Sequence, residues 1–129
     1  MIDSPEQFPR AFAAAFSTQD APAIGAMLMP QTGVLTLTGQ WADSAEQAEA
    51  LYAADFAGPL VRARLVTGRA SLIPLGPGAA VLHQRYVVTG ATDGDGHELP
   101  RIGAMLTATL TATPEGWLAL SLCLAPLVV

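Results

Sequence analysis

The chain is 129 residues long, carries a formal net charge of −5 and contains six basic residues, all of them arginine. Nucleic acids and anionic membranes are bound through clustered Lys and Arg side chains, so this composition argues against both as partners. The length predicts one domain over residues 1–129, and the hydrophobic content of 51% predicts apolar surface that meets a partner subunit or encloses a cavity.

Cysteine content and the two ends of the chain predict a cytoplasmic protein. The single cysteine, Cys123, excludes an internal disulfide and is typical of a reducing compartment. The first residues, MIDSPEQFPR, contain no apolar stretch of the kind found in signal peptides. The apolar ending, LALSLCLAPLVV, is too short to span a bilayer, so no membrane association is expected.

The first half of the chain carries helical patterns. Over 4–17 a capping serine and an early proline precede phenylalanines spaced four residues apart, which predicts a helix with one apolar face. A shorter helix is predicted over 18–30, between Asp20 as its cap and Pro30 as its stop. A short strand is predicted over 33–39. A third helix is predicted over 43–58, where Ser44 and Gln47 form a capping box.

From residue 60 the hydrophobic period changes from 3.6 to 2. Four long strands are predicted over 60–75, 79–91, 100–113 and 117–127. The segments between them, GPG, TDGDGHEL and PEG, are hairpin signals, so the strands form an antiparallel meander. The predicted fold class is α+β, with a curved sheet wrapped around helices and a pocket where short helices fail to fill its mouth.

Four stretches resemble the nuclear transport factor 2-like superfamily, which includes SnoaL-like cyclases, ketosteroid isomerase, scytalone dehydratase and limonene epoxide hydrolase. They are FAAAFSTQDAPAIGAML, GQWADSAEQAEAL, AAVLHQRYVVTG and LTATLTATPEGWLALSL, and together they extend over nearly the whole chain. The resemblance implies a cone-shaped α+β barrel, with three N-terminal helices packed in the concavity of a curved, mostly antiparallel sheet. It does not imply one reaction, because this fold carries isomerases, dehydratases, hydrolases, cyclases and non-enzymatic dimers.

The chain departs from the catalytic patterns of these relatives. Epoxide hydrolases carry Arg-x-Asp on the third of the four stretches, whereas here Arg85 is followed two places on by Val87. Ketosteroid isomerase has a tyrosine in its first helix, where this chain has Phe12 and Phe16. Many relatives end the last strand with histidine, where this chain has Cys123. None of the named mechanisms is therefore expected to carry over whole.

His83 and Arg85 are the predicted catalytic residues. On a strand they share one face, while Leu82, Gln84 and Tyr86 share the other. By analogy with the epoxide hydrolase arginine, the face with His83 and Arg85 is expected to point into the cavity. There His83 would act as acid or base and Arg85 would hold a developing oxyanion.

A structural alternative exists for each candidate. Arg85 can instead form a buried ion pair with a helix carboxylate such as Asp55. Trp41, Tyr52 and Phe56 are the predicted ligand-binding residues at the mouth of the pocket, although aromatic side chains at such spacing also build ordinary cores. Leu51, Tyr52, Asp55 and Phe56 lie close together on the third helix by their spacing.

No metal site and no cofactor are predicted. His83, His97 and Cys123 lack metal-ligand spacing. The stretch DGDGHE resembles the start of a calcium loop, but the glycine and glutamate that such a loop needs are replaced by Glu98 and Ala104. It is therefore predicted to be a hairpin turn.

The predicted function is a small-molecule-binding, SnoaL-like protein with an apolar pocket. It would bind a small hydrophobic ligand, as a cofactor-independent isomerase, cyclase or dehydratase or by sequestering the compound. The alternative is a non-catalytic dimerisation or ligand-sensing module, which the missing carboxylate at the usual base positions favours. In both cases a homodimer is expected, because threonines alternate with small and apolar residues on one sheet face from Thr107 to Thr113.

Overall fold

The computed structural model describes residues 1–127; the last two residues of the predicted domain, Val128 and Val129, lie outside the described residues. A short 3-10 turn, η1, precedes the first helix. The helices are α1 (Phe8–Ser17), α2 (Ala21–Gly25) and α3 (Ala45–Phe56), and η1 spans Pro5–Gln7. The strands are β1 (Leu28–Leu35), β2 (Trp41–Ser44), β3 (Arg64–Pro74), β4 (Ala79–Thr89), β5 (Ile102–Thr113) and β6 (Gly116–Pro126).

All the strands join one six-stranded sheet in the order β2-β1-β6-β5-β4-β3. β3, β4, β5 and β6 pair antiparallel in sequence, which confirms the predicted meander. β1 pairs parallel with β6 and antiparallel with β2. The sheet is therefore mixed, mostly antiparallel and unclosed.

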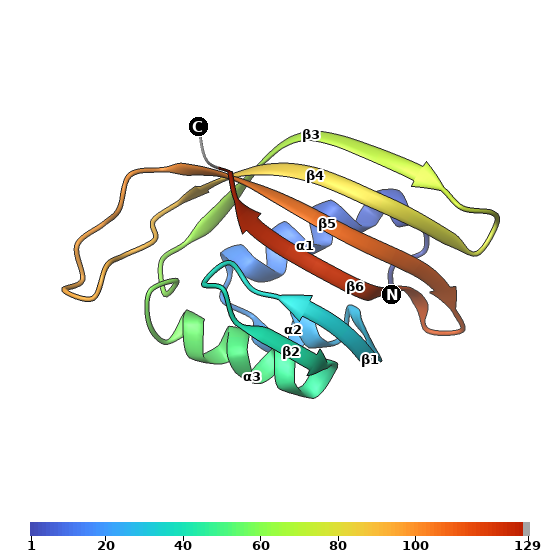
Figure 1. Ribbon diagram of the computed structural model, residues 1–129, viewed down its shortest axis with the longest axis horizontal. Coiled ribbons are helices and arrows are strands. Elements are labelled where there is room, and N and C mark those ends of the chain that lie inside the picture. Colours follow the sequence, from blue (N-terminus) through green and yellow to red (C-terminus); the bar gives the residue numbers. More distant parts are fainter. Residues whose placement is uncertain (128–129) are drawn as a thin grey trace.

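The sheet curves over the helices, which lie on its concave side (Figure 1). α1 packs against β3 at one end of the sheet, and α3 packs against β1 and β2 at the other. This arrangement confirms the predicted α+β class with three helices in the concavity of a curved sheet.

Several elements in the first half differ from the prediction. The strand predicted over 33–39 is β1, which begins and ends earlier, at Leu28–Leu35. The second helix ends at Gly25 instead of running to Pro30, because the following apolar residues join the sheet: the backbone N–H of Ala119 donates to the carbonyl of Met27 at 2.8 Å. Pro30 is tolerated in β1 because the register with β6 shifts between Leu28 and Gly33. Strand β2 was not predicted; it takes the residues up to Ser44, whose hydroxyl caps α3 by accepting from the Gln47 N–H at 3.1 Å.

An aromatic cluster fills the space between the helices and the sheet. The predicted apolar face of α1 supplies three of its rings, and centroid distances between neighbouring rings run from 5.3 to 6.5 Å. Each of the rings is between 0% and 6% exposed. The cluster consists of Phe8, Phe12, Phe16, Tyr52, Phe56 and Tyr86.

Within residues 1–127, no helix has both the length and the apolar character needed to cross a bilayer.

Candidate functional site

Strand β4 places its two predicted catalytic side chains on the outer face of the sheet. Leu82, Gln84 and Tyr86 are buried against the helices, whereas His83 is half-buried and Arg85 is exposed. The prediction that the face with His83 and Arg85 points into the cavity is therefore wrong. The side chains alternate between the two faces as predicted, but the inner face carries Gln84 and Tyr86, whose polar groups form hydrogen bonds there.

Those partners explain the choice of face. The Tyr86 hydroxyl donates to the carbonyl of Pro9 on α1 at 2.6 Å. The Gln84 side-chain amide donates to the carbonyls of Gly68 and Arg85 at 3.0 and 2.8 Å. A buried guanidinium would need a carboxylate in the same place, and uncompensated burial of a charge costs several kcal/mol.

Tyr52 and Phe56 lie inside the cone, one turn apart on α3. Both belong to the aromatic cluster; Tyr52 makes edge contacts with Phe12 and Phe16, and Phe56 makes one with Phe16. These two predicted ligand-binding residues are therefore core residues, on the opposite side of the sheet from His83.

Trp41 lies on the outer face, on β2. It is 56% exposed, pairs in register with Leu35, and its indole N–H donates to the Asp43 carboxylate at 2.7 Å. Its ring covers Gly33 of β1, where an added Cβ would come 2.8 Å from the ring edge. The five predicted site residues thus divide into two sets, one inside the cone and one outside, and do not line a common cavity.

Asp55 is buried beneath the loop that joins β1 to β2, and its partner there is a hydroxyl group. The Thr38 hydroxyl donates to Asp55 Oδ2 at 2.9 Å, and the Thr36 and Thr38 hydroxyls lie 3.2 Å apart. Among residues 1–127 Asp55 forms no ion pair with Arg85, so the alternative pairing predicted from the sequence is wrong. Burial raises the pKa of the Asp55 carboxyl above its usual range, and the Thr38 hydroxyl lowers it in part.

The Tyr52 hydroxyl is buried and, among residues 1–127, has no hydrogen-bond partner. Burial raises the pKa of Tyr52, and the nearby Asp55 and Cys123 raise it further. A buried polar group without a partner is rare and calls for an explanation, such as a bound water or ligand. The helical spacing of Tyr52 and Asp55 in the sequence predicted that these two residues lie close together. Nothing in the sequence indicated Thr38, because it comes from a loop.

Two open hollows lie on the outside of the molecule near the predicted site residues. One, of about 190 Å³, crosses the outer face of β3, β4 and β5 and is lined by Arg69, Ala70, Ser71, His83, Arg85 and Met105. The other, of about 570 Å³, separates the turn after α3 from the β4–β5 hairpin and is lined by Gly58, Pro59, Val61, Arg62, Thr92, Asp93, Gly94 and Gly96.

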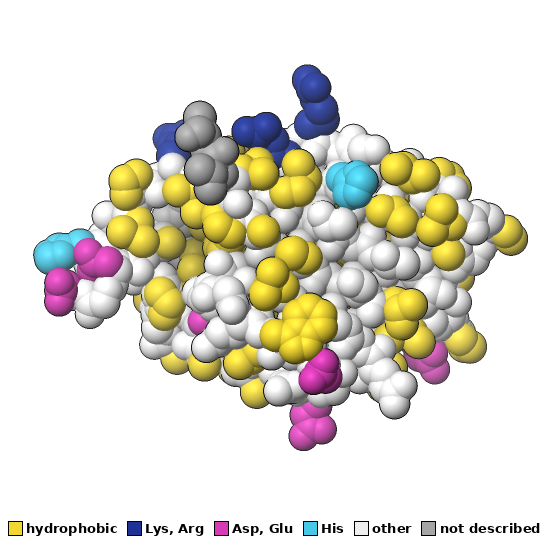
Figure 2. All heavy atoms as spheres, in the orientation of Figure 1, with side chains coloured by type: hydrophobic (Ala, Val, Ile, Leu, Met, Phe, Trp, Pro, Cys, Tyr) yellow, Lys and Arg dark blue, Asp and Glu magenta, His cyan; other side chains and the backbone are white. Residues whose placement is uncertain are grey.

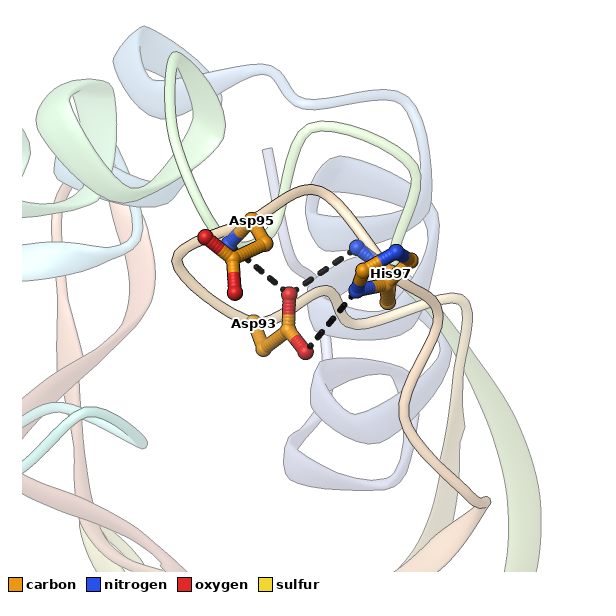
Figure 3. Close-up of side chains that lie close together, drawn as sticks. All are labelled: Asp93, Asp95 and His97. Carbon is orange, nitrogen blue, oxygen red and sulfur yellow. Dashed lines mark hydrogen bonds and ion pairs between the residues drawn. The ribbon is translucent and has the colours of Figure 1, made fainter.

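The β4–β5 hairpin brings together Asp93, Asp95 and His97 (Figure 3), whose potential ligand atoms all lie within 4.8 Å of one another. Asp93 Oδ1 accepts from the backbone N–H groups of Asp95 and His97, both at 2.9 Å. Asp93 Oδ2 lies 3.6 Å from His97 Nδ1. These contacts hold a hairpin turn, as predicted for this stretch, and all three side chains are exposed.

No family model and no curated protein matches the sequence. Solved structures do match. An uncharacterised protein with a cystatin-like fold from Caulobacter vibrioides has a TM-score of 0.84 and 14% identity, over 95% of this chain and 87% of that one. A nuclear transport factor 2-like superfamily protein from Salmonella enterica has a TM-score of 0.78 and 16% identity, over 94% and 87%. A candidate dehydratase of the same family from Streptomyces avermitilis has a TM-score of 0.77 and 14% identity, over 96% of both chains.

The fold is that of the nuclear transport factor 2-like superfamily. At these identities the likeness establishes the fold alone. Besides the exposed hairpin cluster, chemistry-bearing residues of the described part of the chain gather at Tyr52 and Asp55 inside the cone and at His83 and Arg85 outside it.

Proposed function

We propose that this chain is a non-catalytic binding module that works as a homodimer through its outer sheet face. The observation that carries this proposal is the filled interior, where six aromatic rings occupy the space between helices and sheet. An enzyme with its site inside the cone needs a cavity there that encloses most of its substrate. None of the four hollows described for residues 1–127 is lined by the rings of this cluster.

The composition of the outer face supports self-association. One row of side chains crosses all six strands in register, and none of them is an acid. The row consists of Ser71, His83, Thr107, Cys123, Leu35 and Trp41. A two-fold interface places the same surface on both subunits, so uncharged and apolar residues are compatible with it whereas a block of one charge is not.

Figure 2 shows the distribution of charge around this surface. Arginine side chains gather along one edge, and most of the carboxylates visible in this view lie along the other edges and on the projecting hairpin. Hydrophobic and uncharged side chains fill the middle. Exposed apolar surface of this kind, rimmed by polar groups, is typical of protein interfaces.

Light scattering on the purified chain tests the proposal. At micromolar concentration we expect a mass of twice 13.3 kDa. A specific dimer should bury on the order of 1,200 Å² or more in total. A monomeric mass over the whole concentration range would contradict the proposal.

A second candidate function is supported by one observation, the buried Tyr52 hydroxyl without a partner beside Asp55. In this case the chain would be a cofactor-independent enzyme, such as an isomerase or dehydratase, acting on a small hydrophobic carbonyl compound. Tyr52 would donate to the substrate oxygen and Asp55 would move a proton, in place of His83 and Arg85. The candidate dehydratase with this fold is consistent with such chemistry.

An NMR titration with cyclohexanone, a small neutral carbonyl compound, tests this second candidate. Saturable shifts at the amides around Tyr52 and Asp55 that disappear in Tyr52→Phe would support an internal site. Shifts absent at millimolar ligand, or unchanged in Tyr52→Phe, would leave the binding module as the function.

A further inference from the structure

The hollow on the outer face of β3, β4 and β5 gathers hydrogen-bond donors, and no carboxylate of residues 1–127 lines it. Two guanidinium groups, a hydroxyl and an imidazole line it, from Arg69, Arg85, Ser71 and His83. Among residues 1–127, neither Arg69 nor Arg85 makes an ion pair. Arg64, on the same strand as Arg69, instead donates to the carbonyl of Ser17 at 3.1 Å.

The backbone beneath the hollow is held by a buried side chain. The register between β3 and β4 shifts between Thr67 and Ala70, so Gly68 and Arg69 form a bulge opposite Arg85. Gln84 is 1% exposed, and its amide donates to the carbonyls of Gly68 and Arg69 at 3.0 and 3.3 Å. A bulge redirects the side chain that it carries. Gln84 therefore fixes from the inside the segment from which Arg69 projects on the outside.

The second guanidinium lies beside a glycine on the neighbouring strand. A Cβ added at Gly103 of β5 would lie 3.7 Å from Arg85 Nη2, so the Arg85 side chain lies along the sheet over this glycine. The Arg85 residue is exposed at the surface. The apolar part of the hollow comes from Met105, the register partner of Arg85, and from Ala70.

We propose that this hollow binds a small dianionic ligand, a phosphate monoester or a dicarboxylate. A guanidinium presents its N–H groups as a planar fork that matches the oxygens of carboxylate and phosphate. Two such forks compensate two negative charges, and no carboxylate of residues 1–127 forms an ion pair with either of them. The volume of about 190 Å³ is smaller than that of pockets for drug-sized ligands, so the ligand is compact. This site goes beyond the proposed dimer, because every group that forms it belongs to one chain.

Isothermal titration calorimetry with inorganic phosphate, succinate and acetate at low ionic strength tests the site. We expect at least one of the two dianions to bind about tenfold or more tightly than acetate, and to weaken when salt is added. Arg69→Gln and Arg85→Gln should each weaken that binding by about tenfold or more. Arg62→Gln removes the same charge elsewhere and should leave it unchanged, and circular dichroism checks that each variant folds.

The results of these titrations distinguish a phosphate monoester from a dicarboxylate, and they test the anion site separately from the proposed dimer. Preference for phosphate assigns a phosphate monoester, and preference for succinate assigns a dicarboxylate. The site is overturned if neither dianion binds more tightly than about 10 mM. It is also overturned if acetate binds equally well, or if Arg62→Gln weakens binding as much as Arg85→Gln does. Light scattering on the same samples reports the dimer independently, so either proposal can fail while the other stands.

Discussion

Two buried tyrosines in the same aromatic cluster differ in one hydrogen bond. The Tyr86 hydroxyl donates to Pro9, whereas the Tyr52 hydroxyl has no partner among residues 1–127. An unpaired buried polar group costs about 1–3 kcal/mol, so we expect Tyr52→Phe to raise the free energy of unfolding by about 1 kcal/mol. Tyr86→Phe should lower it by about 1 kcal/mol, because it removes a made hydrogen bond. Urea unfolding of both variants checks this, and an equal loss in the two would show that Tyr52 has a partner in solution.

The buried Asp55 should make stability depend on pH. Its pKa is raised on folding, so the native state binds a proton more tightly than the unfolded chain does. The stabilising proton is fully bound below the unfolded value of about 3.8 and is lost as pH rises through the folded pKa. Asp55→Asn keeps an oxygen that can accept from Thr38 and removes the charge. We therefore expect the variant to exceed the wild type in stability at pH 7.5 and to lose that advantage toward pH 4, in urea melts across this range.

For individual residues, the sequence predicted correctly which side chains of β4 share a face, but it predicted the wrong face as the inner one. The alternation of β4 identified the two faces, and Tyr52, Phe56 and Asp55 were correctly grouped on one helix. Which face of β4 points inward depends on whether Gln84 and Tyr86 find partners across the fold. Those partners, the carbonyls of Gly68 and Pro9, lie 16 and 77 residues away in the sequence. A local pattern contains no information about them.

At the scale of elements, the end of β4 and the turn after α3 approach each other closely at a position where only a glycine fits. Gly90 has φ +79°, and an added Cβ there would overlap the carbonyl oxygen of Arg62. Gly96, in the following hairpin, has φ +82° and open space around it. Gly96→Ala should lower the free energy of unfolding by about 1–2 kcal/mol, which is the cost of placing an alanine in the left-handed conformation. Gly90→Ala adds an overlap with backbone, so its total cost should reach about 3 kcal/mol or more.

Chemical denaturation of the two alanine variants measures that difference. Both glycines share the backbone conformation, so Gly96→Ala is the matched control for it. Equal losses would mean that the segments at Gly90 and Arg62 move apart easily, and that the close approach does not hold the two elements together.

The elements that the sequence predicted well are those that pair with their neighbours in the chain. The strands from β3 to β6 form sequential hairpins, and the residue types of each turn indicate in the sequence where it lies. β1 is different, because besides pairing with β2 it pairs parallel with β6, about 90 residues away: Leu28 lies opposite Ala119. β2 is a short edge strand that pairs with β1, and it was missed although the two strands are neighbours in the chain. The apolar run after Gly25 is compatible with a helix or a strand, and only pairing with β6 decides between them.

At the scale of the whole molecule, the concave face of the curved sheet is packed against the helices, whereas its outer face is exposed to solvent. The helices cover the concave side alone, and the outer face carries half-buried and exposed residues in register across six strands. The aromatic cluster is part of the hydrophobic core of the single chain. In our two proposals this outer face binds a second copy through the row that crosses the sheet and an anion at its arginine-bearing edge, where Ser71 and His83 belong to both.

The proposed dimer should be disrupted by a charge at one position in the middle of that face. Thr107 is exposed on β5, between His83 and Cys123 in the row that crosses the sheet. Thr107→Arg would introduce a charge into the proposed interface of each subunit, and the row that crosses the sheet contains no acid to pair with it. A buried unpaired charge costs about 3–5 kcal/mol, so the dissociation constant should rise by at least about 100-fold. Light scattering should then report a monomer at concentrations where the wild type is a dimer.

Ala14→Arg is the matched control, because Ala14 is exposed on α1, on the helical side of the molecule. It adds the same side chain and the same charge, so it should leave the dimer intact. The thermal midpoint of the wild type should also rise with protein concentration, because association stabilises the folded state by mass action. That dependence should be lost in Thr107→Arg and kept in Ala14→Arg. If Thr107→Arg remains a dimer, the subunits associate through another surface, and the outer face is free for a different partner.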